Sequence, residues 1–140
     1  MPSVEPSRPS HDDIQEENLG LRRSSQLRYV AAIDIGTNST HLLVASVDPI
    51  LHTFNIELAE KSTTRLGEVD GDSGDLTELA MKRVFETLQR FKELAASYKA
   101  EELVTAATSA VREAPNGIDF LKHIKEDLDI DVDLISGAQE

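Results

Sequence analysis

The hydrophobic pattern predicts a folded chain that starts near residue 29 with three consecutive strands. Apolar runs at 29–35 and 41–48 have the length and composition of buried strands, and Pro49 ends the second run. Apolar and polar residues then alternate over 52–62, which predicts a third strand with one apolar face. The apolar members of that alternation are Phe54, Ile56 and Leu58. Because the connections are short, the three strands are expected to form an antiparallel meander.

Helical spacing replaces the strand pattern after a polar, glycine-rich stretch at 65–75, which is predicted to be a loop. Its acids at 70, 72 and 75 do not follow the frame of an EF-hand, so a solvated acidic loop is expected. Residues 76–98 form the clearest helix, and Thr77 is placed to cap its first turn. The residues expected on its core-facing side are Leu76, Leu79, Val84, Leu88, Phe91, Ala95 and Tyr98.

Shorter elements complete the chain. Residues 102–107 predict a buried strand, and 108–114 predict a polar crossing into a short helix. Asn116 is placed to cap a second helix at about 117–128, and a last strand is expected at 131–135. The order is therefore β-β-β-α-β-α-β, which predicts an α/β fold with a mixed sheet and helices packed on it.

The connection between the first two strands carries the candidate chemistry. It contains Gly36, Thr37, Asn38, Ser39 and Thr40. A glycine lets the backbone approach a ligand closely, and the surrounding hydroxyl, amide and N–H groups suit a phosphate. Asp34 adds a carboxylate at the end of the strand, in outer-sphere reach of a divalent cation. A phosphate–metal site is the first hypothesis, and an ordinary hairpin with a polar turn is the alternative.

Three polar segments are expected to meet near this loop. In sheets of this kind, ligand-binding loops gather at the carboxyl ends of the parallel strands. The segments 34–40, 108–112 and 136–140 all follow or adjoin predicted strand ends. Their convergence on one cleft strengthens the phosphate-site hypothesis over that of a simple polar turn.

The composition of the chain excludes some classes of binding partner. The chain has 140 residues, which is one domain of usual size, and a formal net charge of −12, so no general attraction to nucleic acid or anionic membranes is expected. It has no Cys, and neither a membrane-length apolar stretch nor an apolar leader, so a reducing, cytoplasmic compartment is expected. Residues 1–28 are rich in Pro, Ser and charge, and they are predicted to form a disordered tail before the folded part at 29–140.

Four segments, in order, resemble the exopolyphosphatase and guanosine pentaphosphate phosphohydrolase family. They are Ala32–Val44, Arg65–Glu68, Thr108–Leu121 and Ile135–Glu140. That family belongs to the superfamily of actin, sugar kinases and heat-shock chaperone ATPases, so the resemblance implies an actin-like (ribonuclease H-like) fold. The resemblance covers about 29–140 and implies a truncated first lobe, because the family's second glycine-rich phosphate loop and second lobe are not in this sequence.

The resemblance also implies an activity and residue roles. The full-length protein would hydrolyse a terminal phosphoanhydride bond of polyphosphate or guanosine pentaphosphate, with Mg²⁺, and a homodimer is its expected assembly. Residues 36–40 would cradle a phosphate, Asp34 would help to hold Mg²⁺ through water, and Arg112 would bind a phosphate oxygen. Glu140 aligns with the family's catalytic glutamate, which activates the attacking water. The 140-residue chain alone is expected to be inactive.

Two departures and several alternatives remain. Gln139 stands where the family usually has a glutamate, and Thr37 stands where serine is common. Asp34 as a simple hairpin cap and Arg112 as a surface arginine paired with Glu113 or Asp119 are the alternatives for those residues. A kinase or ATPase of the same superfamily, or a non-catalytic phosphate or nucleotide sensor, are the alternatives for function.

Overall fold

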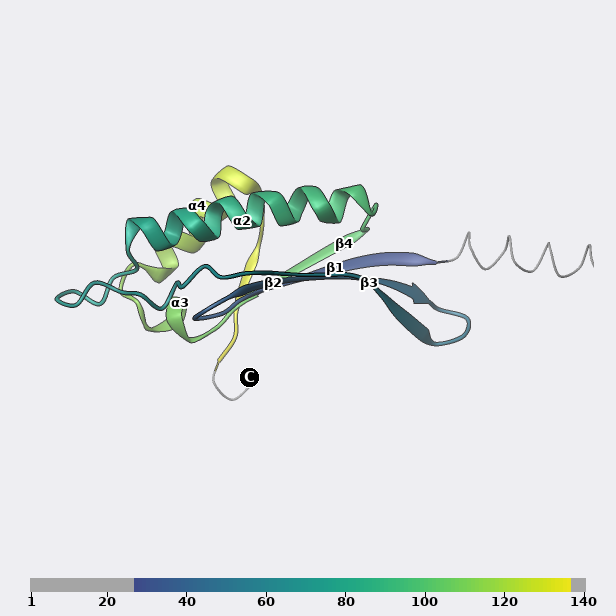
Figure 1. The fold of residues 1–140 in the computed structure, drawn as a ribbon, viewed down its shortest axis with the longest axis horizontal. Coiled ribbons are helices and arrows are strands. Elements are labelled where there is room, and N and C mark those ends of the chain that lie inside the picture. The colour runs from purple at the N-terminus through teal and green to yellow at the C-terminus, as the bar shows by residue number, and fades with distance from the viewer. Residues whose placement is uncertain (1–26, 137–140) are drawn as a thin grey trace, which may run out of the picture.

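A computed structural model describes residues 27–136, and in these the chain forms a five-stranded mixed sheet (Figure 1). The sheet order is β3-β2-β1-β4-β5, so the first strand lies in the centre. β1 pairs antiparallel with β2 and parallel with β4, which confirms the predicted meander and crossover. The strands are β1 (Arg28–Ile35), β2 (Thr40–Asp48), β3 (Thr53–Ser62), β4 (Glu102–Ala107) and β5 (Val132–Leu134). Of the predicted tail at 1–28, residues 1–26 lie outside the described residues, and its order stays a prediction.

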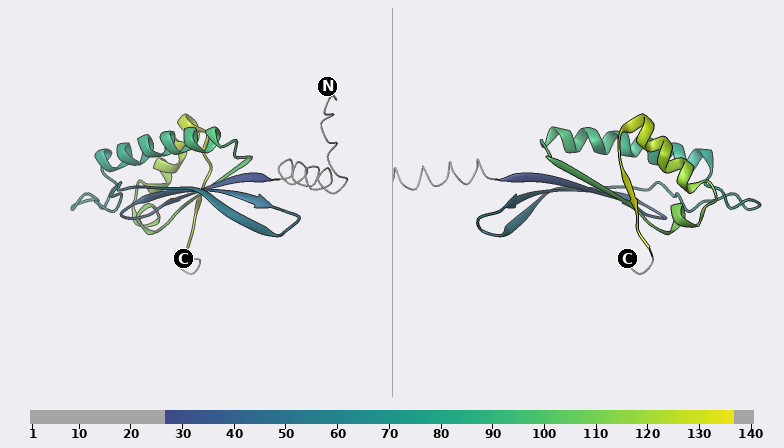
Figure 2. Two further views of the ribbon diagram at one scale, coloured as in Figure 1. Left: turned by 45° about the vertical axis from the view of Figure 1, so that its right-hand side comes forward. Right: turned by 180° about the vertical axis from the view of Figure 1, so that it is seen from behind.

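The helices are α2 (Glu78–Ser97), α3 (Ser109–Glu113) and α4 (Gly117–Leu128). α2 and α4 lie over the same face of the sheet in every view, while α3 sits near the loop that joins β1 to β2 (Figures 1 and 2). The predicted mixed α/β fold is therefore confirmed. Among residues 27–136, no helix is both long and apolar enough to cross a membrane.

α2 begins as predicted and turns most of the predicted residues toward the core, with Leu79 as the exception. The Thr77 hydroxyl oxygen accepts a hydrogen bond from the Ala80 backbone N–H at 3.1 Å, which caps the first turn. Leu79 was expected to face inward, yet it is 64% exposed. Each residue turns a helix by about 100°, so the burial of Ala80 carries Leu79 to the flank. The buried stripe is Ala80, Val84, Thr87, Leu88, Phe91 and Ala95.

A β-bulge breaks the alternation predicted for β3. The register between β2 and β3 shifts at Val44/Ala45, where Leu58 pairs with Val44 but Ile56 pairs with Ala45. One extra residue in β3 therefore lies between two paired positions, and side chains on either side of it point to opposite faces. Leu58 packs against the core, whereas Phe54 and Ile56 are 67% and 58% exposed. The prediction of one shared apolar face was wrong for this strand.

Asn116 precedes α4 as predicted but does not cap it. Its side chain makes no capping hydrogen bond to α4. Instead, its Oδ1 accepts from the Leu76 N–H at 2.8 Å, and its Nδ2 donates to the Leu76 carbonyl at 3.1 Å. The amide thus satisfies both backbone groups of a buried residue from 40 positions away and ties the start of α4 to the chain entering α2.

Candidate functional site

The loop between β1 and β2 is a tight, partly exposed turn. The Gly36 N–H donates to the Ser39 carbonyl at 3.0 Å, and a Cβ built on Gly36 would lie 2.9 Å from that same oxygen. Glycine is therefore required here for close backbone packing. Asn38 is the exposed tip, whereas Thr40 is fully buried at the start of β2. The predicted phosphate loop thus presents its middle residues outward and its last residue inward.

The segment after β4 lies against this loop, as predicted. Ile35 and Ala107 are partners at the carboxyl ends of the parallel strands β1 and β4. The Thr108 N–H donates to the Ile35 carbonyl at 3.3 Å. The hydroxyls of Thr37 and Ser109 are hydrogen-bonded at 3.1 Å across 72 positions of sequence. A pocket of about 310 Å³ opens beside these two side chains. Two of the three predicted segments are therefore brought together.

Residues 64–67 form a second wall of the loop, to which sequence analysis assigned no role. The Gly67 N–H donates to the Thr37 carbonyl at 2.8 Å, and the Arg65 N–H donates to the Asn38 carbonyl at 3.0 Å. On the buried side, the hydroxyls of Thr40 and Thr64 are hydrogen-bonded at 2.9 Å. The sequence signal was the match of 65–68 to the family pattern, but the hydrophobic pattern marked this stretch only as a loop.

Asp34 points away from the helices, onto the open face of the sheet. It is exposed, and its register partner on β2 is His41. Both residues line a shallow cavity of about 630 Å³, together with Thr108 and Ile135. Among residues 27–136, no group of three or more His, Asp or Glu side chains could hold a metal ion. A single accessible carboxylate fits Mg²⁺ that is held mainly by water and by substrate phosphate.

Arg112 connects α3 to the end of β5. Its Nη1 donates to the Ile135 carbonyl, and the Ile135 N–H in turn donates to the Ala107 carbonyl at 2.9 Å. The side chain is half-buried at the edge where the parallel strands end. The third predicted segment, 136–140, begins at this point. Gln139 and Glu140 lie outside the described residues, so their predicted roles stay predictions.

The acidic side chain of Asp70 stabilises a turn within its own loop. The Asp70 Oδ1 accepts backbone N–H groups of Asp72 and Ser73, each at 2.9 Å. These hydrogen bonds, that from the Ser73 N–H first and that from the Asp72 N–H next, lower the pKa of the exposed Asp70 carboxyl below its ordinary value. The carboxylate thus stabilises an Asx-type turn, which gives Asp70 a structural role.

A wider apolar groove lies elsewhere, between α2 and α4. It has a volume of about 640 Å³, and its apolar lining includes Met81, Phe85 and Phe120. None of the three predicted polar segments lines it. The groove is mostly apolar, although Lys82, Asn116 and His123 also line it, and it does not include the carboxyl ends of β1 and β4. The loop at 36–39 is therefore the better candidate site.

Known proteins resemble the chain over most of its length. It is 31% identical over 111 residues to exopolyphosphatase 1 of Mycobacterium tuberculosis, covering 79% of this chain and 32% of that protein. The crystal structure of the Aquifex aeolicus Ppx/GppA family member superposes with a TM-score of 0.76 at 30% identity, covering 81% of this chain and 36% of that one. An exopolyphosphatase from Cytophaga hutchinsonii gives a TM-score of 0.74 at 32% identity, covering 79% and 35% of the two chains.

The sequence and structural similarities, together with the match to a family model, show the family to which the chain belongs. The chain spans about a third of the length of the curated exopolyphosphatases that it matches. The model of the Ppx/GppA phosphatase family matches residues 43–140, so the loop at 36–40 lies just before the matched stretch. The actin-like arrangement predicted from the sequence agrees with the superposed family structures. The chain belongs to the Ppx/GppA phosphatase family.

Proposed function

We propose that the full-length protein hydrolyses the terminal phosphoanhydride bond of inorganic polyphosphate. The observation that carries this proposal is the packing of the loop at 36–39 against Ser109 and against residues 64–67, at the carboxyl ends of β1 and β4. The similarity to proteins named exopolyphosphatase supports polyphosphate as the substrate. Guanosine pentaphosphate ends in the same type of linkage, so it is the second substrate of the proposal.

The loop would bind the phosphate mainly through its outer residues. The hydroxyls of Thr37 and Thr40 are hydrogen-bonded to Ser109 and Thr64, respectively. The backbone N–H groups of 37–39 and the exposed Asn38 side chain would therefore donate to the phosphate oxygens. The protein has a net charge of −12, so local donors and a cation must overcome its long-range repulsion of a polyanion.

Asp34 would help to hold Mg²⁺ through water at the open face of the sheet. Mg²⁺ keeps much of its hydration shell and takes one or two carboxylates plus phosphate oxygens, which suits this single carboxylate. When bound, the ion would neutralise charge that develops on the transferred phosphoryl group. Asp34 is the residue before Ile35, the last residue of β1, so the strand that leads into the loop would serve both the ion and the phosphate.

Arg112 and Glu140 would complete the chemistry. Arg112 holds the end of β5 through the Ile135 carbonyl, and its guanidinium would bind a phosphate oxygen as a planar, charged donor group. Glu140 follows Ile135 by five positions and would orient or deprotonate the attacking water. The 140-residue chain by itself would have negligible activity, because it spans only a third of the relatives' length. The full-length protein would be cytoplasmic and homodimeric.

Phosphate release by the full-length protein tests the proposal. Polyphosphate, guanosine pentaphosphate and ATP would be supplied in parallel with Mg²⁺, and Glu140→Gln would be compared with Glu126→Gln, a change of an exposed α4 residue. We expect release from polyphosphate and a drop in kcat of about 10²–10⁴-fold in Glu140→Gln only. Turnover of ATP alone would instead indicate a superfamily kinase or ATPase, and binding without turnover would indicate a sensor.

A further inference from the structure

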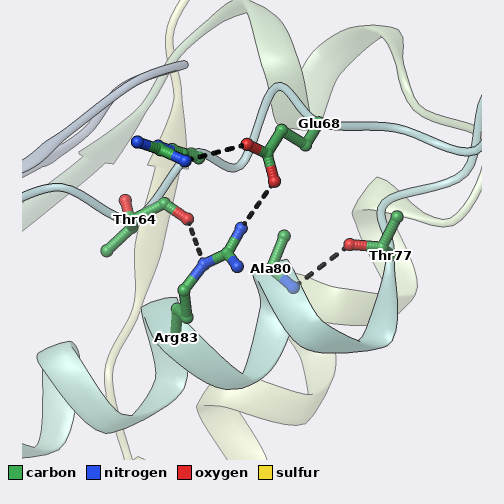
Figure 3. Close-up of polar contacts among 6 residues, drawn as sticks. Thr64, Glu68, Thr77, Ala80 and Arg83 are labelled. Carbon is green, nitrogen blue, oxygen red and sulfur yellow. Dashed lines mark hydrogen bonds and ion pairs between the residues drawn. The ribbon is translucent and has the colours of Figure 1, made fainter.

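Arg83 on α2 reaches out of the helix toward the segment that supports the loop (Figure 3). Its Nε donates to the Thr64 carbonyl at 2.8 Å, and its Nη2 donates to Glu68 Oε2 at 2.9 Å. The Arg83 side chain is only 30% exposed, so these contacts are partly shielded from water. Two charge-assisted hydrogen bonds from one planar group to two separate acceptors fix both position and orientation. Arg83 therefore clamps the two ends of the segment 64–68.

The clamped segment makes all three of the contacts described above with the loop. Backbone N–H groups of Arg65 and Gly67 donate to the carbonyls of Asn38 and Thr37, and the Thr64 hydroxyl bonds that of Thr40. Arg83 holds Thr64 and Glu68, the first and last residues of the segment, and all three contacts come from residues within it. A shift of the segment would therefore move the loop residues that are proposed to bind phosphate.

The segment needs a clamp because its backbone is unusual. Arg65 has a φ of +52°, in the left-handed region that residues with a Cβ rarely adopt. Such a conformation persists only where surrounding contacts hold it, and it is enriched at functional sites. The second oxygen of Glu68 lies 3.6 Å from Arg65 Nη1, so Glu68 joins Arg65 to the same clamp.

We propose that Arg83 is a positioning residue for the phosphate loop, acting through residues 64–68 on Thr37, Asn38 and Thr40. The inference rests on the proposed function only in taking this loop as the phosphate site. The mechanical link itself is a property of the chain, and it can be measured without a substrate. Arg83 contacts no reacting group; it holds the loop in the shape that binding requires.

Hydrogen exchange in the 140-residue chain tests the mechanical link. In Arg83→Gln, we expect the exchange of the Arg65 and Gly67 amides to accelerate about tenfold or more, as loss of a hydrogen bond to a charged group implies. Arg83→Lys should not restore protection, because one ammonium cannot reproduce the fork that serves Thr64 and Glu68. Lys82→Gln is the matched control, since the exposed Lys82 pairs only with its helix neighbour Glu86 among the described residues.

A control for general loss of stability separates positioning from simple destabilisation. Val84→Ala removes buried methyl groups beside Arg83 without touching the clamp, so it should speed exchange across the core rather than at two loop amides. Unchanged protection of Arg65 and Gly67 in Arg83→Gln would overturn the inference, whatever the activity. The inference would also be overturned if exchange of these two amides in Arg83→Gln accelerated no more than exchange of core amides such as that of Ile33.

Kinetics of the full-length protein test the consequence for the site. We expect Arg83→Gln to raise KM for polyphosphate about tenfold with a smaller change in kcat, and Glu68→Gln to add little in the double variant, because both act through one clamp. Accelerated exchange with unchanged kinetics would confirm the clamp and contradict the loop's role in the proposed function. Equal losses in Arg83→Gln and Val84→Ala would reduce Arg83 to a stability residue.

Discussion

Gly67→Ala is expected to disturb the candidate site through one methyl group. A Cβ built on Gly67 would lie 2.3 Å from the Thr37 Cγ2 atom, well inside the 3.4–4 Å of ordinary contact, and 3.3 Å from the Thr37 carbonyl oxygen. Gly67 is not among the residues with positive φ, so its backbone does not require glycine. The conflict is therefore steric, and it lies with one side chain of the loop.

The cost can be worked out from the contacts of Thr37. Rotating its side chain would remove the clash but break the hydrogen bond to Ser109, which contributes about 0.5–1.5 kcal/mol. Leaving it in place strains the packing, which typically costs about 1–3 kcal/mol. Alanine restricts the unfolded chain and returns about 0.4–1 kcal/mol. A net loss of about 1–2 kcal/mol is expected.

Thr37→Ser supplies the matched background, because it keeps the hydroxyl and deletes the clashing methyl. In that background Gly67→Ala should be close to neutral, so the two changes should couple by at least about 1 kcal/mol. The measurement is the free energy of unfolding of the four chains in urea. Additivity within about 0.5 kcal/mol would show that residue 67 does not press on Thr37, and it would refute the account of how 64–67 supports the loop.

Three further changes have definite expected outcomes. Gly117→Ala places a Cβ 1.9 Å from the Val111 backbone oxygen, which cannot rotate away, so urea denaturation should show a loss of about 3 kcal/mol or more. Asn116→Ala removes both hydrogen bonds to a buried backbone and should cost about 1–3 kcal/mol in the same assay, whereas Asn116→Asp should retain the acceptor half. The hydrogen bond from Lys125 lowers the pKa of Asp129, so its stabilising contribution is present above the ordinary value of 3.8 and lost as pH falls through the lowered pKa. Carboxyl NMR titration should show that midpoint rise toward 3.8 in Lys125→Gln, and an unchanged midpoint would contradict the pairing.

Local signals predicted most of the fold because the elements follow their own spacing. The helix cap at Thr77 and the position of the strand at 102–107 were predicted correctly, because each depends on residues within a few positions. The prediction that this strand is buried was wrong, since only Thr105 and Ala107 are buried and Val104 is 47% exposed. Phe54 was misplaced because a bulge is set by pairing with another strand, which periodicity does not contain. Asn116 has the composition of a cap, but a backbone 40 residues away competes for its amide more effectively than the next helical turn.

The candidate site also has one part that the sequence predicted and one part that it did not. The meeting of the loop with the start of α3 follows from the rule that parallel strands end at one edge, and the Thr37–Ser109 contact agrees with it. The support from 64–67 could not be predicted from the hydrophobic pattern, because two of its three contacts are backbone hydrogen bonds and the third joins threonine hydroxyls 24 positions apart. Arg83 is not among the residues that helical spacing placed on the core-facing side of α2, and this spacing cannot show which of the other side chains meets a loop.

The central claim is that residues 36–39 bind the terminal phosphate, and a crystal structure of the full-length protein with Mg²⁺ and a non-hydrolysable polyphosphate analogue tests it most directly. The account predicts phosphate oxygens about 2.7–3.2 Å from backbone nitrogens of 37–39, with the ion on the side of Asp34. An analogue that is bound elsewhere, for example at the groove between α2 and α4, with the loop untouched, would contradict it.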